Sequence, residues 1–151
     1  MIVAPLKKHL LFLIFYWPCA GLNSQPANDF GTKDRISNGL EGNIFALSTD
    51  TRTLPDFDTM SSLGTIYTKE LNIPRRSWTS GFPGVTDRFE WFGIEYKANF
   101  TAKKAGRYTF TLLSDDGAKF FIDDSLVVDN DGLHGQVKKA TFSNLTNHPI
   151  K

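Results

Sequence analysis

The stretch RYTFTLLSDDGAKFFI (residues 107–122) decides the fold class of this chain. In its first half, Tyr108, Phe110 and Leu112 alternate with polar residues, and this period of two is typical of a half-buried β-strand. The run at 118–122 is apolar enough to be a second strand. We therefore predict that the two strands pair as antiparallel neighbours, with the three alternating side chains buried against alternate residues of 94–100.

The tetrad between the two strands, Ser114-Asp115-Asp116-Gly117, has the composition of a tight turn. A turn of this kind closes a hairpin and places the carboxylates of Asp115 and Asp116 at its tip. The tip is therefore a candidate binding site. The simpler interpretation is structural: the aspartates accept hydrogen bonds from backbone N–H groups, and Gly117 supplies a positive φ.

Outward from this stretch, further strand patterns alternate with turn signals, and no strong helical pattern occurs. Strands are expected at residues 39–47, 64–68, 89–100, 126–128 and 136–142. This pattern favours an all-β fold, an antiparallel β-sandwich of the lectin-like type. The residues at 144–149 look like a turn leading into another strand, so we expect the sandwich, residues 39–151, to be truncated at its C-terminal strands.

The N-terminus has the layout of a secretory signal peptide, predicted over residues 1–21. Lys7 and Lys8 precede an uncharged apolar run at 10–17, and Pro18-Cys19-Ala20-Gly21 supplies a break and small residues. The apolar run is far shorter than the roughly 20 residues that span a bilayer, so no stable membrane span is expected. A lipid anchor at Cys19 is the minor alternative, because Pro18 fits such signals poorly. Residues 22–38 are polar and are expected to form a linker.

Composition narrows the class of protein further. Cys19 is the only cysteine, so the exported chain would have neither a disulfide nor a reactive thiol. Removing the two leader lysines from 17 basic residues leaves 15 against 16 acidic ones, a formal charge of −1. This balance gives no electrostatic case for binding nucleic acid. We expect a secreted or cell-surface protein.

Several segments resemble the PA-14 domain family, the lectin-like β-sandwich of protective antigens and adhesins. They are GLEGNIF (39–45), FEWFGI (89–94), AGRYTFTLLSDDG (105–117) and FFIDDSLVVD (120–129). The GFPG turn at 81–84 with the aromatic strand after it is similar to the bacterial fibro-slime style of the domain. The resemblance implies an extracellular module of adhesins, toxins, glycosidases and cell-surface proteins, which often binds sugar and takes part in cell adhesion.

The resemblance also implies a metal site. In fungal adhesins of this family, the matching Asp-Asp pair is joined by a cis peptide and binds calcium, which then grips sugar hydroxyls. By that likeness, Asp115 and Asp116 are the candidate metal ligands and calcium is the candidate cofactor. Because calcium takes about six to eight oxygen ligands, two aspartates cannot complete its shell. The second acidic turn, Asp129-Asn130-Asp131-Gly132, lacks the spacing of a calcium loop and is interpreted as a turn that could lie near the first tip.

Trp78, in an expected loop, is a second candidate ligand-binding residue, since its ring face can stack on a sugar. Its alternative is a place at the rim of the core. No catalytic motif occurs, and two neighbouring carboxylates seldom flank a sugar from opposite sides, so an enzyme is not expected. The sequence thus predicts a non-catalytic module for carbohydrate or another cell-surface ligand. A structural or interaction domain without a ligand, and an accessory domain of a glycoside-acting enzyme, remain the alternatives.

Overall fold

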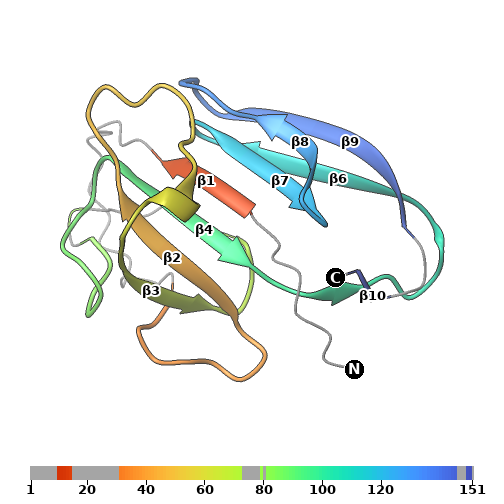
Figure 1. Cartoon of the computed structure of the whole chain (residues 1–151), viewed down its shortest axis with the longest axis horizontal. Helices are drawn as coiled ribbons and strands as arrows, with labels where there is room; N and C mark the ends of the chain where they lie inside the picture. Colours follow the sequence, from red (N-terminus) through yellow and green to blue (C-terminus); the bar gives the residue numbers. More distant parts are fainter. Residues whose placement is uncertain (1–9, 15–30, 73–78, 80, 146–148, 151) are drawn as a thin grey trace, which may run out of the picture.

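The computed structural model describes residues 10–14, 31–72, 79, 81–145 and 149–150. The described chain is almost entirely β-structure, as predicted (Figure 1). Its strands are β1 Leu10–Ile14, β2 Leu40–Ala46, β3 Ser62–Thr68, β4 Phe92–Lys97, β5 Phe100–Thr101, β6 Gly106–Ser114, β7 Ala118–Ile122, β8 Ser125–Asn130, β9 Val137–Leu145 and β10 Pro149–Ile150. A single 3-10 turn, η1 Phe57–Thr59, is the only helical element within the described ranges.

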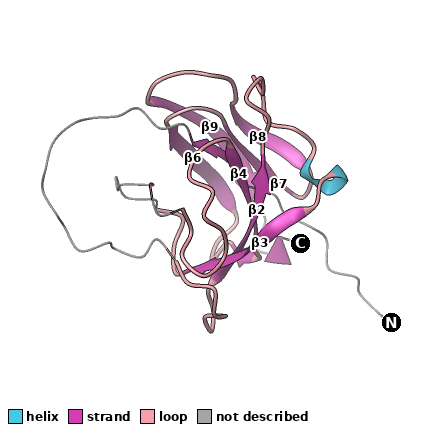
Figure 2. Ribbon diagram, turned by 90° about the vertical axis from the view of Figure 1, so that its left-hand side faces the viewer, coloured by secondary structure: helices cyan, strands magenta, loops and turns pink. Residues whose placement is uncertain are grey.

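The strands form one large sheet and two small ones. The large sheet has six strands in the order β3-β2-β4-β1-β7-β8, whereas β6 pairs with β9 and β5 with β10. Every strand pairing within the described residues is antiparallel. The β6–β9 pair lies against the β7–β8 side of the large sheet, which gives two layers at that side (Figures 1 and 2).

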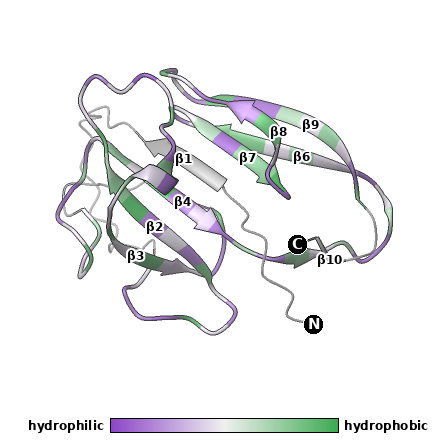
Figure 3. Ribbon diagram, in the orientation of Figure 1, coloured by the Kyte–Doolittle hydropathy of each residue, from purple (hydrophilic) through white to green (hydrophobic). Residues whose placement is uncertain are grey.

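The main core fills the space between these layers. Ile44 of β2, Phe92 and Ile94 of β4, and Ala118 of β7 have no exposed surface. Leu112 of β6 completes this cluster from the other layer. The long loops at the strand ends are largely hydrophilic, whereas the apolar segments lie in the strands (Figure 3). Burial of these apolar side chains is the dominant favourable term in the stability of the fold. The described part holds no cysteine, so no disulfide adds to it.

The outer face of the large sheet is covered as well. Phe57 of η1 stacks on Phe45 of β2 with ring centroids 4.5 Å apart. The same ring lies directly over Gly93 of β4, where an added Cβ would collide with Phe57 Cζ. Both faces of β4 are therefore buried, which removes the alternation of polar and apolar residues that a half-buried strand would show.

The predicted hairpin between the strands flanking Ser114–Gly117 is wrong. β6 pairs with β9 along its whole length, and β7 pairs with β8 and β1. The tetrad is therefore an arch that carries the chain from one layer to the other. Turn composition alone does not distinguish the two cases, because a hairpin and an arch both need a sharp reversal between strands.

Burial of the alternating residues of β6 is confirmed only in part. Leu112 is buried in the cluster that contains Ile94 and Tyr96, whereas Tyr108 and Phe110 are half-buried. The Phe110 ring lies between those of Phe100 and Phe120, with centroids 6.5 and 5.1 Å away. The side chains of Phe110 and Leu112 thus face the large sheet, as expected if the tetrad carries the chain from one layer to the other.

The segment expected to be the apolar core of a signal peptide takes part in the large sheet. β1 lies between β4 and β7 and pairs with both (Figure 1). Removal of residues 1–21 stays a prediction from the sequence.

Candidate functional site at the arch

The arch between β6 and β7 is held rigidly at its second aspartate. The backbone N–H of Asp116 donates to the carbonyl oxygen of His134 at 2.9 Å, and the N–H of His134 donates to Asp116 Oδ1 at 3.0 Å. Asp116 is 6% exposed and adopts φ +64°, a left-handed conformation that Asp tolerates better than most residues. Asp115, one residue earlier, is exposed. The site therefore presents one carboxylate to solvent beside another that is fixed in place.

The ring of His134 is held between two carbonyl oxygens. Nε2 lies 2.9 Å from Asn130 O, and Nδ1 lies 2.8 Å from Gly135 O. A carbonyl only accepts hydrogen bonds, so this geometry is satisfied at both nitrogens only by the doubly protonated ring. Partial burial lowers the pKa of His134, but the two carbonyls and the charge of Asp116 outweigh it and hold the pKa above its usual value.

Position 117 of the arch requires glycine because atoms of the second acidic turn lie close to it, and not because its φ is positive. The positive φ falls on Asp116, and a Cβ on Gly117 would meet Asp131 Oδ1 at 2.7 Å and Gly132 N at 3.0 Å. The structural interpretation of the tetrad is therefore corrected in this detail. The arch touches the second acidic turn, as the sequence allowed, and the two turns form one unit.

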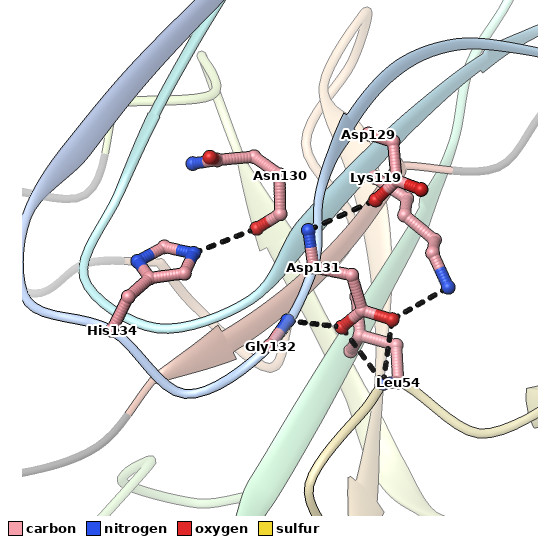
Figure 4. A network of polar contacts seen from close by, with 7 residues as sticks. All are labelled: Leu54, Lys119, Asp129, Asn130, Asp131, Gly132 and His134. Carbon is pink, nitrogen blue, oxygen red and sulfur yellow. Dashed lines mark hydrogen bonds and ion pairs between the residues drawn. The ribbon is translucent and has the colours of Figure 1, made fainter.

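Asp131 joins three parts of the chain (Figure 4). Its carboxylate accepts from the backbone N–H of Leu54 at 2.9 Å and from that of Gly132 at 2.8 Å, and it pairs with Lys119 Nζ of β7 at 2.6 Å. Its side chain is only 10% exposed. Because its oxygens are engaged in these contacts, Asp131 is a structural residue and not a candidate metal ligand.

Asn130 lies beneath the arch and has no exposed surface. Its Nδ2 donates to Ser114 Oγ at 2.6 Å and to the carbonyl of Val137 at 3.1 Å. Its Oδ1 has no hydrogen-bond partner among the described residues. Sequence reasoning missed the roles of Asn130, Asp131 and His134 at this site, although the acidic turn that contains Asn130 and Asp131 was recognised. The only sign in the sequence that these residues contact the arch was that a second turn of similar acidic composition follows it.

The chemistry of the arch suits calcium, but the number of ligands does not complete a shell. Asp115 and Asp116 offer hard carboxylate oxygens, which calcium prefers. Within the described ranges, no group of three or more His, Cys, Asp or Glu side chains is placed to hold a metal ion. The peptide between the two aspartates is trans, unlike that of the adhesin pair. Trp78 lies outside the described residues, so the structure does not place it.

A shallow hollow of about 330 Å³ lies on the outer face of the large sheet. It is lined by Leu54, Pro55, Asp56, Phe57, Asp58, Glu95, Lys119 and Phe121. Three of its charged groups pair with residues beside the hollow: Glu95 and Asp58 with Lys97 at 2.9 and 3.3 Å, and Lys119 with Asp131. The fourth, Asp56, accepts from the backbone N–H of Asp58 at 3.1 Å. This hollow is built from residues that stabilise the fold.

Comparison with known proteins agrees with this architecture. The family model described as PA14 domain matches residues 39–149, which is most of the chain, so the chain belongs to the PA14 domain family. The family is one of carbohydrate-binding type modules that are generally non-catalytic. No curated protein and no solved structure matches the chain. Among the described residues, no helix has the length and apolar character needed to cross a membrane.

Proposed function

We propose that this protein is an exported, non-catalytic module that binds carbohydrate through the arch at Asp115 and Asp116. The observation that carries the proposal is the pairing of an exposed carboxylate with one immobilised by His134. A sugar hydroxyl donates readily to a carboxylate, and an immobilised acceptor loses little conformational entropy when it binds.

Calcium is proposed as the cofactor of this site. Asp115 and Asp116 would be the ligands contributed by the arch, and water and sugar hydroxyls would fill other positions. Calcium would supply a positive charge that offsets the repulsion of the two carboxylates. With so few protein ligands, we expect weak binding, on the order of the 10⁻⁴ to 10⁻³ M typical of extracellular calcium modules.

A glycan array probed with calcium and with chelator tests this proposal. The variant is Asp115→Asn with Asp116→Asn, which removes both charges but keeps a side-chain oxygen that can accept from His134. The matched control is Asp123→Asn with Asp124→Asn. Both aspartates of this second pair are exposed, have φ of +48° and +62°, and lie at the other end of β7.

The proposal predicts that glycan binding requires calcium, disappears in the arch variant and persists in the control. Calcium should also raise the melting temperature of the parent and the control, but not that of the arch variant. Glycan binding that survives in the arch variant would place the site elsewhere. If neither calcium nor glycan binds the parent chain, the arch is structural and the protein is an interaction domain without this ligand.

A further inference from the structure

The outer face of the β6–β9 pair is defined by the alternation of residues along both strands. Tyr108, Phe110 and Leu112 pack into the core clusters, so the alternate residues of β6 face away from the large sheet. Residues directly opposite each other in an antiparallel pair share a face, and the register gives their partners on β9. The outer face therefore consists of eight exposed residues: Arg107, Thr109, Thr111 and Leu113 of β6, and Asn144, Phe142, Ala140 and Lys138 of β9.

Two large apolar side chains on this face are open to solvent. Phe142 is 59% exposed and Leu113 is 53% exposed, the two highest values among the large apolar residues that the structure describes. The guanidinium carbon of Arg107 lies 3.9 Å from the centroid of the Phe142 ring, which is the geometry of a cation–π contact. This contact orients the guanidinium group. A planar guanidinium in a fixed orientation is well placed to bind a carboxylate or a similar oxyanion through two parallel hydrogen bonds.

The charge of this layer differs from that of the rest of the chain. Residues 102–114 and 135–145, which contain β6, β9 and the loop before β6, hold five basic residues and no acidic one. The five are Lys103, Lys104, Arg107, Lys138 and Lys139. They belong to the 15 basic residues that follow residue 21, so ten basic residues face 16 acidic ones elsewhere. The layer is thus cationic within an otherwise acidic chain, and it favours an anionic partner.

The positions of these groups suit an extended ligand. Arg107 and Leu113 are six residues apart on β6, and Lys138 lies opposite Leu113, so the two cations of the face are roughly 20 Å apart along the strands. Thr109 and Thr111 place hydroxyl groups between them, and a hydroxyl can both donate and accept a hydrogen bond. The exposed Phe142 ring adds an apolar surface on which a sugar ring can stack.

We propose that the outer face of the β6–β9 pair binds an acidic polysaccharide. Its carboxylate or sulfate groups would bind Arg107 and Lys138, and one of its sugar rings would stack on Phe142. An anionic membrane is a poorer match, because two threonines lie between the cations and only two apolar side chains of the face could enter the lipid. This surface uses no residue of Ser114–Gly117 and no metal ion, so the proposal goes beyond the function proposed for the arch.

Binding measurements on the full chain test this proposal, with chelator present so that calcium takes no part. The probes are heparin, which is sulfated, and polygalacturonate, which is carboxylated, with uncharged dextran, vesicles of anionic lipid and single-stranded DNA for comparison. Arg107→Gln with Lys138→Gln removes the two charges of the face, and Phe142→Thr removes its ring. The matched control is Arg52→Gln with Lys69→Gln, which removes the same two residue types from exposed positions outside the face. All these side chains are exposed, so the melting temperatures should stay close to that of the parent.

The expected result is that an acidic polysaccharide binds without calcium, that dextran does not, and that binding weakens as the salt concentration rises. The affinity should fall at least tenfold in the charge variant of the face, at least threefold in Phe142→Thr and less than twofold in the control. Because calcium is absent, failure of the proposal for the arch would leave this result unaffected.

Four outcomes would overturn the proposal. Equal losses in the face variant and the control would show that only net charge matters. Unchanged binding by Phe142→Thr would show that no sugar ring stacks there. Tighter binding of the vesicles or of the DNA would assign the face to a membrane or to nucleic acid, and a parent chain that binds neither acidic polysaccharide has no such site.

Discussion

Asp116 and His134 form a reciprocal pair of hydrogen bonds at the arch: the N–H of Asp116 donates to the carbonyl oxygen of His134 at 2.9 Å, and the N–H of His134 donates to Asp116 Oδ1 at 3.0 Å. This pair fixes the link between the two layers. It also places the candidate site beside a histidine, the side chain whose ordinary pKa lies closest to neutrality.

Replacing the side chain of Asp116 separates its structural role from its charge. Asp116→Ala removes the acceptor for the His134 N–H and places alanine at φ +64°, so we expect a loss of roughly 1–3 kcal/mol in the free energy of unfolding. Asp116→Asn keeps an acceptor and tolerates this φ, so its loss should be smaller. Urea unfolding of both variants measures the difference. Equal losses would show that the carboxylate charge, not the hydrogen bond, holds the arch.

The raised pKa of His134 predicts a pH-dependent stability. The protonated ring is favoured in the folded state, so its contribution is fully present below the unfolded pKa of about 6.5 and is lost as the pH rises through the higher folded pKa. NMR titration of the ring should give the folded pKa directly. The free energy of unfolding, measured between pH 5.5 and 8.5, should depend less on pH in the variant His134→Gln than in the parent. A ring that titrates below 6.5 in the folded protein contradicts the prediction.

Gly117→Ala should destabilise the arch, because its Cβ would collide with Asp131 Oδ1 and the backbone of Gly132. Moving Asp131 would also disturb its bonds to Leu54 and Lys119. We expect a loss of about 1–3 kcal/mol, as for other overpacked sites. Gly106→Ala is the control, because nothing lies within 4 Å of its Cβ position. Comparable melting temperatures for the two variants would argue against the close approach.

Gly93 and Phe57 should be energetically coupled, since the ring occupies the space of the missing side chain. Gly93→Ala alone should displace η1 and cost roughly 1–3 kcal/mol. In a Phe57→Leu background, the smaller side chain should reduce that cost. A double-mutant cycle measured by urea unfolding gives the coupling energy, and a value within about 0.3 kcal/mol of zero would contradict the contact.

Sequence patterns located the strands well but did not determine how they pair. The run at 118–122 is β7 without any shift in its bounds, and the alternating residues of β6 do face the other layer. Only local information was available for the turns. The tight two-residue hairpin is at Asp123–Asp124, where both φ values are positive, while the similar pair at 115–116 forms the arch. Which acidic pair closes a hairpin depends on contacts with Asp131 and His134, distant in sequence from the arch.

The place of the tetrad between two strands could be predicted from the sequence, whereas the tertiary contacts that hold it could not. Asp115 and Asp116 are named by their place between two strands. The bonds that immobilise Asp116 come from His134, whose loop is brought there by the pairing of β6 with β9. The residues of the tetrad do not indicate that β6 pairs with β9. The part of the site that depends on tertiary contact was therefore beyond any local pattern.

Because the arch is the covalent bridge between β6 in one layer and β7 in the other, it also lies on a path for mechanical force. A pull that slides one layer over the other would load Ser114–Gly117, and the two hydrogen bonds between Asp116 and His134 lie on the same path. A ligand held by both aspartates would brace this bridge against shear. If the module is anchored at one end and holds its ligand through the arch, the hydrogen bonds between Asp116 and His134 would determine both how much force the arch withstands and how long the ligand stays bound.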